Sequence, residues 1–239
     1  MSVPYESVML ARERADGRPV LCDLYSGAGG AARGYQMAGF YVVGIDNRPQ
    51  PRYAGDEFVQ ADALGFLLEG FDAVHASPPC QAYVDSANKA KHPKLIEPTR
   101  ARLVLTKQPF VIENVDKAPL LFPIRLCGTF FGLRVIRHRH FETWPRLGLF
   151  DTPCNHWGRV SEGTFAGVYG RGGRGARYID AQGRHKRVGP VPKDSKATEF
   201  FAAAMGIEAV LTRYELTQAI PPAYAHYIGT RLMALLRPS

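Results

Sequence analysis

The chain has 239 residues, a formal net charge of +8 and a sequence pI near 9.4. Hydrophobic residues make up 46% of the sequence and charged residues 22%, a balance that is typical of a folded globular protein and excludes a disordered one. No apolar run reaches membrane-spanning length, and the first residues lack the basic and then apolar layout of a secretory signal. We therefore expect one sizeable α/β domain with a small appended element, located in the cytoplasm.

Short apolar runs that end at turn residues predict the strands of a parallel sheet. Helical spacing or loops separate these runs, and this alternation predicts a doubly wound, mostly parallel, Rossmann-like α/β sheet. The expected strands lie, in chain order, within residues 19–27, 40–47, 59–62, 71–79 and 109–115. The expected helices are GGAARGYQMAG with its terminal Gly39, TEFFAAAMG capped by Gly206, and a last helix from about Pro222 to Leu236.

Two stretches lack such patterns. Residues 1–17 resemble a polar lead-in, and residues 146–197 are rich in Gly, Arg and Pro with little periodicity. We expect the second stretch to be an irregular insertion with a flexible loop rather than a second hydrophobic core.

The basic residues gather in one part of the chain. Between residues 134 and 188 there are 11 basic and four acidic residues, so this stretch carries +7, almost the whole net charge. A basic face of this kind favours a polyanionic partner such as nucleic acid.

The four cysteines are far apart and form no CxxC pair, so neither a disulfide framework nor a zinc ribbon is expected. Cys154 and His156 could be drawn as a metal site together with His138 and His140. We favour the interpretation that this is a polar surface segment, and we predict no metal.

Four chemically active side chains fall at or just past the ends of expected strands, namely Asp23, Asp46, Cys80 and Glu113. In a parallel sheet, ligand-binding residues lie just beyond the carboxyl ends of the strands. DLYSGAGG, with its glycines between a strand and a helix, together with Asp46 predicts a nucleoside-cofactor site, because an acid at the end of the second strand suits a ribose. By itself this pattern would serve NAD as well, although the spacing is not GxGxxG.

Cys80 directly follows Pro78 and Pro79. Isolated cysteines are more often inert core residues, but the rigid prolines and the basic loop that follows favour an exposed nucleophile. Glu113 ends an apolar strand, where a carboxyl is costly unless it has a partner or a role; a helix cap or a bridge to Lys117 is the alternative.

The order and spacing of these motifs resemble the cytosine-C5 DNA methyltransferase family. DLYSGAGG, GIDN and QAD resemble its cofactor motifs, PPCQ its nucleophile motif and ENV its base-binding motif. RHRHF resembles its arginine motif, and TQAIPPAYAHYIG its carboxy-terminal motif. The resemblance spans about residues 20–145 and 212–232, and it implies the class I fold of S-adenosylmethionine (SAM)-dependent methyltransferases.

For the reaction, the resemblance implies that the thiolate of Cys80 adds to carbon 6 of a flipped-out cytosine, so that carbon 5 can attack the methyl group of SAM. Glu113 would bind the exocyclic amine and ring N3, while Arg139 and, less directly, Arg137 would hold the base carbonyl and nearby phosphates.

For binding, the resemblance implies two sets of residues. The expected cofactor-binding residues are Tyr25 on the adenine, Gly27 and Gly29 beside the methionine, Asp46 on the ribose, Asp62 on the adenine amine, and Pro78. The expected nucleic-acid-binding residues are Gln81, Lys89, Lys91, Arg171 and Arg174.

The resemblance also implies a division of the chain. Residues 1–145 would be the first part of the catalytic domain, 146–205 a short target-recognition segment, and 206–239 the helices that complete the domain. We expect a monomeric, stand-alone bacterial or phage enzyme, of the kind found in restriction–modification, that acts on double-stranded DNA. A tRNA cytosine-C5 methyltransferase and a non-catalytic DNA-binding relative remain as alternatives.

Overall fold

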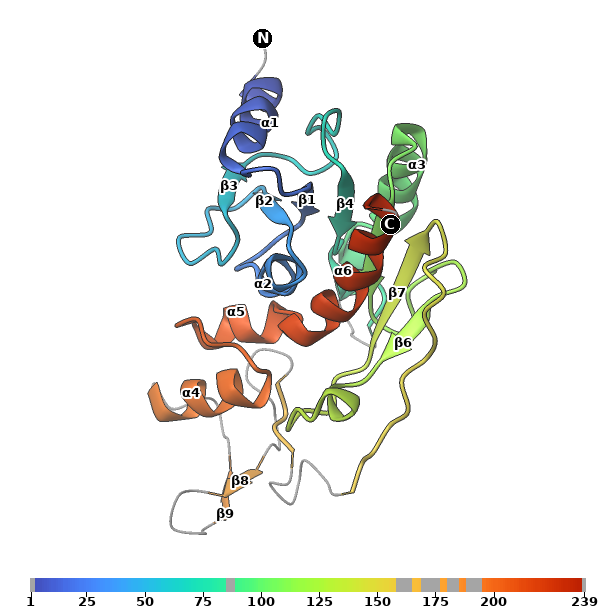
Figure 1. The fold of residues 1–239 in the computed structure, drawn as a ribbon. Helices are drawn as coiled ribbons and strands as arrows, with labels where there is room; N and C mark the ends of the chain where they lie inside the picture. The colour runs from blue at the N-terminus through green and yellow to red at the C-terminus, as the bar shows by residue number, and fades with distance from the viewer. Residues whose placement is uncertain are drawn as a thin grey trace.

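The computed structural model describes residues 3–84, 89–157, 165–168, 177–179, 185–187 and 195–237. Within them, seven strands form one sheet in the order β3-β2-β1-β4-β5-β7-β6 (Figure 1). The strands β3, β2, β1, β4 and β5 are parallel, β7 is antiparallel to β5, and β6 is antiparallel to β7. The strands are β1 (Val20–Leu24), β2 (Tyr41–Asp46), β3 (Glu57–Gln60), β4 (Ala73–Ala76), β5 (Phe110–Asn114), β6 (Ile124–Leu126) and β7 (Arg139–Trp144). The predicted doubly wound, mostly parallel sheet is thus confirmed.

The central strands form because they are apolar on both faces. Every residue of β1, β4 and β5 is buried, as is usual for a parallel sheet that helices cover on each side. A separate antiparallel pair, β8 (Arg177–Ile179) with β9 (His185–Arg187), lies in the region predicted to be an irregular insertion.

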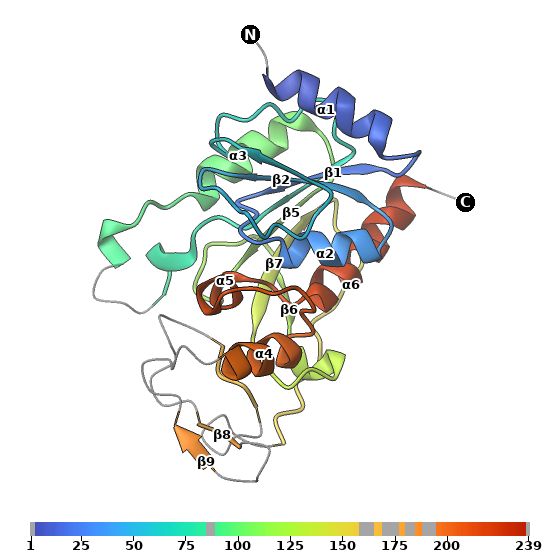
Figure 2. The ribbon, with the colours of Figure 1, turned by 90° about the vertical axis from the view of Figure 1, so that its left-hand side faces the viewer.

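Helices cover the two faces of the sheet (Figure 2). Residues of α1 (Val3–Arg14) and α3 (Ile96–Thr106) share one buried cluster with β1, β2, β4 and β5. Residues of α2 (Gly30–Met37) and α6 (Pro222–Leu236) share the other. The α2 and α6 helices approach closely at Gly34, where a Cβ would collide with the carbonyl oxygen of Pro222, so only glycine permits this contact. The bounds of α6 match the predicted last helix.

The amino-terminal segment differs from the prediction. It was expected to be a polar lead-in, but α1 packs Val8 and Ala11 into the core. Arg12 fastens the helix to the loop before β4, since its guanidinium lies 2.9 Å from the carboxylate of Asp72 and donates to the carbonyl oxygen of Gly70. The sequence pattern was weak because alanine contributes much of the apolar face.

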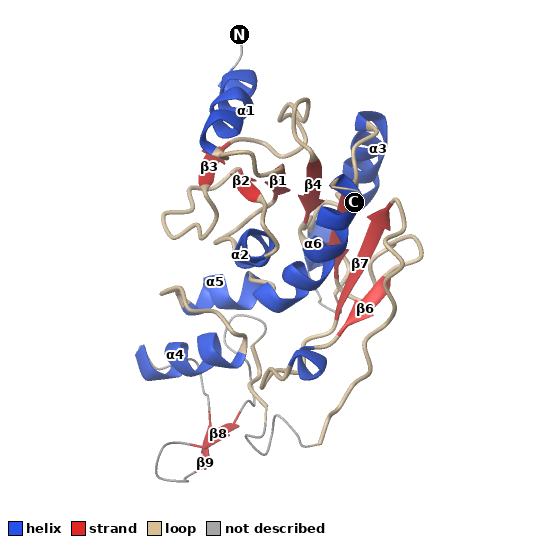
Figure 3. Ribbon diagram, viewed as in Figure 1, coloured by secondary structure: helices blue, strands red, loops and turns tan. Residues whose placement is uncertain are grey.

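Two described residues of the predicted insertion, residues 146–197, join a hydrophobic cluster that residues outside it mainly form. Ala166 and Val168 are buried in a third cluster together with α4 (Ser195–Ala204), α5 (Arg213–Gln218) and the loop after α4. This cluster joins the predicted recognition segment to the carboxy-terminal helices. Figure 3 shows that the chain leaves β7 as a long stretch without helix or strand before it reaches this region.

No helix among the described residues is both long enough and apolar enough to cross a membrane.

Candidate active site

The candidate residues gather at the carboxyl edge of the parallel strands. The strand β1 pairs with β2 on one side and with β4 on the other, so the chain leaves the middle of the sheet in two opposite directions. Ligands of open α/β sheets bind at such a switch point. The loops after β1, β2, β4 and β5 therefore surround one place.

The loop after β1 has the left-handed backbone that its glycines allow. Tyr25, Gly27 and Gly29 all have positive φ, at 58°, 50° and 85°. At Gly29 a Cβ would lie 2.8 Å from the backbone nitrogen of Ala54, so the tight turn into α2 requires glycine there. The amide of Gly27 donates to the carboxylate of Asp46 at 3.0 Å, which joins the ends of β1 and β2.

Both predicted ribose- and adenine-binding acids sit at strand ends. Asp46 ends β2, and besides Gly27 it accepts the amide of Arg48 at 3.0 Å. Asp62 is exposed just past β3 and accepts the amide of Leu64 at 3.3 Å. Backbone amides thus orient both carboxylates.

Asp23, in the middle of the same edge, has no role assigned from the sequence. It is buried, and within the described residues neither of its carboxylate oxygens has a hydrogen-bond partner. Burial raises the pKa of this carboxyl well above its usual range, and the nearby charges of Asp46 and Glu113 add to the rise. Its position at the end of the first expected strand marks it in the sequence, but no local pattern gives it a role.

Tyr25 is half-buried beside this loop. Its hydroxyl lies 3.0 Å from the hydroxyl oxygen of Thr99 on α3, and this hydrogen bond fixes the hydroxyl end of the ring to that helix.

Cys80 begins the short helix η1 (Cys80–Ala82), which the loop Ser77–Pro79 connects to the end of β4. The loop before it is held in place because the side-chain amide of Asn114 donates to the carbonyl oxygen of Pro78 at 2.8 Å, tying β4 to β5. Burial raises the pKa of the half-buried thiol, and the charge of Arg139 opposes this rise. Glu113 acts in the same direction as burial.

Glu113 and Arg139 form a buried ion pair. The guanidinium Nε of Arg139 lies 3.0 Å from the carboxylate of Glu113, and the two side chains are only 18% and 7% exposed. Burial raises the pKa of Glu113, whereas Arg139, then Arg137 and a hydrogen bond from Ser77 lower it. The structure therefore brings Cys80, Glu113 and Arg139 into one electrostatic environment.

Arg137 has a different setting. Its guanidinium is buried and donates to the backbone carbonyl oxygens of Val168 and, at 2.8 Å, of Thr217. Burial lowers its pKa to about 9. Two of its N–H groups are therefore already used in hydrogen bonds near the third hydrophobic cluster. Arg137 affects the candidate active site mainly through its positive charge, which lowers the pKa of Glu113 and Cys80.

A chain of buried hydrogen-bonded side chains runs from Tyr35 on α2 through His75 on β4 to Glu113 on β5. The hydroxyl of Tyr35 lies 2.9 Å from Nδ1 of His75, and Nε2 of His75 lies 2.8 Å from the hydroxyl oxygen of Ser77. Burial lowers the pKa of His75 to about 3, so its ring is neutral. Because Ser77 donates to the carboxylate of Glu113, it must accept from His75, which in turn accepts from Tyr35. No local sequence pattern marks this hydrogen-bonded chain.

The predicted nucleic-acid contacts are only partly described. Lys89 and Lys91 are exposed on the short helix η2 (Lys89–Lys91), which packs near η1. Gln81 is half-buried next to Cys80, and its side-chain oxygen has no hydrogen-bond partner among the described residues. Arg171 and Arg174 lie outside the described residues.

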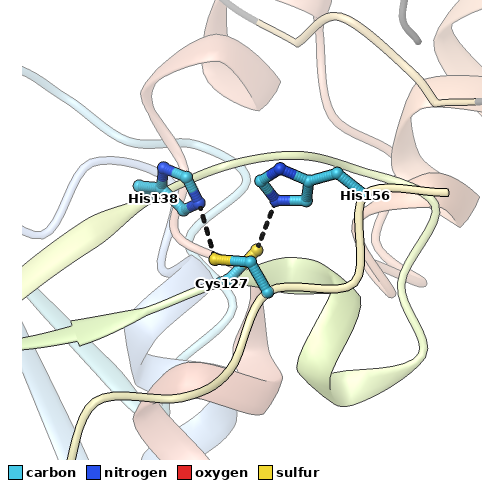
Figure 4. A group of neighbouring side chains, drawn as sticks. Cys127, His138 and His156 are labelled. Atoms are coloured by element: carbon cyan, nitrogen blue, oxygen red, sulfur yellow. Dashed lines mark hydrogen bonds between the residues drawn. The ribbon is translucent and has the colours of Figure 1, made fainter. Parts of the chain in front are cut away.

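A cluster of cysteine and histidine lies beside the outer strands β6 and β7 and shares no residue with the candidate active site. Three of the four residues considered from the sequence as metal ligands do come together, namely His138, Cys154 and His156. The fourth member is Cys127, whereas His140 lies 3.5 Å from the carboxylate of Asp116. Figure 4 shows the rings of His138 and His156 over Cys127.

No protein-family model matches the sequence, and comparison with curated proteins finds no relative. Solved structures do share the fold. A prophage-encoded E. coli protein assigned as a DNA modification methyltransferase aligns with a TM-score of 0.56 at 15% identity, over 91% of this chain and 99% of its own. A substituted form of DNMT2 from Spodoptera frugiperda aligns with a TM-score of 0.53 at 13% identity, over 90% and 99%.

The Dnmt2 methyltransferase of S. pombe gives a TM-score of 0.52 at 14% identity, over 91% of this chain and 99% of its own. At these identities the similarity is one of fold. Together with the strand order, it shows that the chain has the class I fold of SAM-dependent methyltransferases, as predicted.

Proposed function

We propose that the chain is a SAM-dependent DNA methyltransferase that methylates carbon 5 of cytosine through a covalent adduct on Cys80. The observation that carries this proposal is the meeting of a thiol, a buried carboxyl and a guanidinium beside a glycine-rich turn at the switch point of the sheet. The fold, shared with proteins assigned as methyltransferases, supports the same function.

The cofactor side of the site fits SAM better than a dinucleotide. The groups around the glycine turn are acidic, and SAM carries a sulfonium and an ammonium group, whereas a dinucleotide would bring phosphates toward carboxylates. Asp23 has two buried oxygens that lack partners among the described residues, and Asp46 is oriented by backbone amides. Tyr25, Gly27, Gly29, Asp62 and Pro78 would complete the binding site. When bound, SAM would supply the electrophilic methyl group that carbon 5 attacks, and its sulfur would keep the electron pair of the broken methyl–sulfur bond and leave as a neutral thioether.

Cys80 would provide the nucleophile. Its Sγ, after losing its proton, forms a bond to carbon 6 of cytosine, and the ring electrons shift so that carbon 5 becomes an enamine carbon able to attack a methyl group. A base or water then removes the carbon-5 proton, the double bond re-forms, and the Cys80 thiolate leaves. Half-burial at the start of η1 leaves the thiol accessible.

Glu113 would stabilise the charge that develops on the ring. Addition at carbon 6 places negative charge on N3, and a group that holds a proton there lowers the barrier. Burial raises the pKa of Glu113, which favours the protonated form that can donate to N3. Arg139, paired with Glu113 at 3.0 Å, would hold the carboxyl in place and approach the base carbonyl.

Double-stranded DNA is the proposed substrate. The net charge of +8 favours a polyanion, and Lys89 and Lys91 are exposed on η2 near the nucleophile. A target base would have to leave the duplex to reach Cys80, at a cost of a few kcal/mol. We propose that the chain acts as a monomer.

The experiment is methyl transfer from labelled SAM to duplex DNA, followed by base-resolution sequencing of modified cytosines. We expect 5-methylcytosine with the wild type and none with Cys80→Ala, a variant that should still fold because Cys80 is half-buried at a loop. DNA that contains 5-fluorocytosine should trap a covalent complex only when Cys80 is present.

Two results would replace the proposal by its alternatives. Methylation of tRNA with none of duplex DNA would keep the chemistry and change the polymer. DNA binding with no modified cytosine above the Cys80→Ala background would indicate a non-catalytic relative.

A further inference from the structure

Four side chains that can bind a metal, from separate parts of the chain, meet at the carboxyl edge of the sheet beside the outer strands β6 and β7. Cys127 directly follows β6, His138 directly precedes β7, and Cys154 and His156 lie in the loop after β7. Their four ligand atoms, two sulfurs and two ring nitrogens, all lie within 4.8 Å of one another. The antiparallel pairing of β6 with β7 brings the first two together, since it places Leu126 opposite Arg139.

The distances suit a tetrahedral ion. The sulfur of Cys127 lies 3.3 Å from Nε2 of His156, and the sulfur of Cys154 lies 3.3 Å from Nε2 of His138 (Figure 4). In a tetrahedral zinc site, Zn–S bonds of about 2.3 Å and Zn–N bonds of about 2.0–2.1 Å separate sulfur from nitrogen by about 3.6 Å. An ion would therefore need these two sulfur–nitrogen pairs to open by only about 0.3 Å each, and all four ligand atoms already lie within 4.8 Å of one another.

We propose that Cys127, His138, Cys154 and His156 bind one structural Zn²⁺ ion. Two thiolates and two neutral imidazoles form a closed set of four ligands, which is the composition of structural rather than catalytic zinc sites. The two thiolates also neutralise the charge of the ion. Oxygen-preferring cations such as Mg²⁺ and Ca²⁺ are excluded by the same ligand chemistry.

Hydrogen bonds outside the ligand set hold the loop against β6. The amide of Cys127 donates to the hydroxyl oxygen of Thr152 at 2.9 Å, and the amide of Asn155 donates to the hydroxyl oxygen of Thr129 at 3.0 Å. The hydroxyl of Thr129 also lies 3.1 Å from the sulfur of Cys127. These contacts bring Cys154 and His156 to Cys127, so the ligands are arranged before any ion binds.

The location gives the ion a structural consequence. His138 stands between Arg137 and Arg139, and its carbonyl oxygen accepts a hydrogen bond from Arg139 at 2.8 Å. The ion would therefore fix the start of β7, from which Arg139 reaches Glu113, and fasten it to the beginning of the loop that leads to residues 158–197. This role is positional, and it does not depend on the proposed methyl transfer.

The test measures zinc in the purified full chain. We expect about one zinc per chain, and after chelation we expect Co²⁺ to restore the visible bands of tetrahedral cobalt with a thiolate-to-cobalt charge-transfer band. Cys154→Ser and His156→Asn should each lose the metal and lower the Tm by about 5–10 °C. Both side chains are exposed, so either variant should still fold. His140→Asn, two residues after His138 but outside the ligand set, is the matched control and should retain the zinc.

Two results would contradict the proposed zinc site. The first is a wild-type protein that binds neither zinc nor cobalt, and the second is a Cys154→Ser variant that retains a full equivalent of zinc. Loss of two of the four free thiols without any bound metal would show instead that Cys127 and Cys154 form a disulfide. Because the readouts are metal content, absorption spectrum and Tm, they are independent of whether the chain methylates DNA.

Discussion

Around β1, β2 and β3 the carboxyl edge of the sheet carries three aspartate side chains, whereas around β4, β5 and β7 it carries a thiol, one glutamate carboxyl and two guanidinium groups. The two halves belong to the same sheet and are separated only by the boundary between β1 and β4. The first half contains Asp23, Asp46 and Asp62, and the second contains Cys80, Glu113, Arg137 and Arg139.

The carboxyl groups in the two halves have different surroundings. Asp46 is oriented by two backbone amides at a half-exposed position, which is how a binding carboxylate is held. Glu113 is buried against Arg139, and burial raises its pKa. The carboxyl edge of the sheet thus has two regions. One is suited to bind a cationic cofactor, and the other is suited to transfer protons to and from a nucleic-acid base.

The largest expected effect comes from removing the acid in the second half. Glu113→Gln keeps the size and one acceptor but cannot donate a proton as a carboxyl does, so we expect kcat to fall by about 10²–10³-fold. The affinity for SAM should stay within about twofold, because Glu113 lies outside the acidic half. Single-turnover methyl transfer and equilibrium binding of SAM measure the two quantities.

The matched control is Glu142→Gln. Glu142 is also a buried carboxyl on this pair of strands, with Arg100 at 2.7 Å as its partner. Breaking that pair should reduce the free energy of unfolding by about 2–4 kcal/mol and leave kcat nearly unchanged at low temperature. Equal losses of kcat in both variants would mean that Glu113 serves stability alone.

A smaller effect is expected in the acidic half. Asp46→Ala removes the acceptor of the Gly27 and Arg48 amides together with the proposed ribose contact, so the Kd for SAM should rise by about 10–100-fold. Asp46→Asn, which keeps one acceptor oxygen, should raise it less. Calorimetric titration of SAM measures both, and unchanged SAM affinity in Asp46→Ala would place the cofactor elsewhere.

The pH dependence of kcat/KM tests the role of the Cys80 thiol. Burial raises the pKa of Cys80, so at neutral pH most of the group is thiol, and the reactive thiolate increases as pH rises toward that pKa. We therefore expect kcat/KM to increase with pH from about 6 to about 8, by up to tenfold per unit. The alkylation rate of Cys80, followed by peptide mass spectrometry, should rise in parallel.

A flat kcat/KM over this range, together with a rising alkylation rate, would show that proton loss from Cys80 does not limit the reaction.

The sequence predicted the parallel strands and the residues at their ends because both leave local signals. Apolar runs stopped by Gly, Pro or an acid marked the ends of β1, β2, β4 and β5, and Pro78–Pro79 marked Cys80. Two local patterns, the glycine after α2 and the apolar spacing of α6, predicted those helices correctly. The residue assignments themselves remain predictions until the variants are measured.

What the sequence did not predict depends on contacts between distant residues. Cys127 joins His138 only because β6 and β7 pair antiparallel, and β7 begins with the polar run Arg139–His140, which has no strong strand pattern. Arg137 was expected, with Arg139, to hold the base carbonyl and nearby phosphates, whereas in the structure its guanidinium is buried and donates to the carbonyl oxygens of Val168 and Thr217. Neither contact has a signature in the nearby sequence.

The smallest expected effect concerns the buried chain behind Glu113. Tyr35→Phe removes the hydroxyl that donates to His75 and leaves that buried ring nitrogen without its partner, so the free energy of unfolding should fall by about 1–2 kcal/mol. The chain ends at the carboxyl of Glu113 through Ser77, and we expect kcat to fall by about two- to threefold as that carboxyl loses its fixed orientation. Urea unfolding and single-turnover methyl transfer measure the two changes.

Tyr41→Phe separates stability from orientation. Its hydroxyl donates to the carboxylate of Glu57 at 2.5 Å, on the acidic side of the sheet and far from Glu113 in the strand order. This variant should also lose about 1–2 kcal/mol of stability but keep its kcat, because the hydrogen bonds of the described residues do not connect Tyr41 to Cys80, Glu113 or Arg139. If Tyr35→Phe kept its full kcat as well, the buried chain would serve only the packing of α2 on β4, and the acid in the second half would be positioned by Arg139 alone.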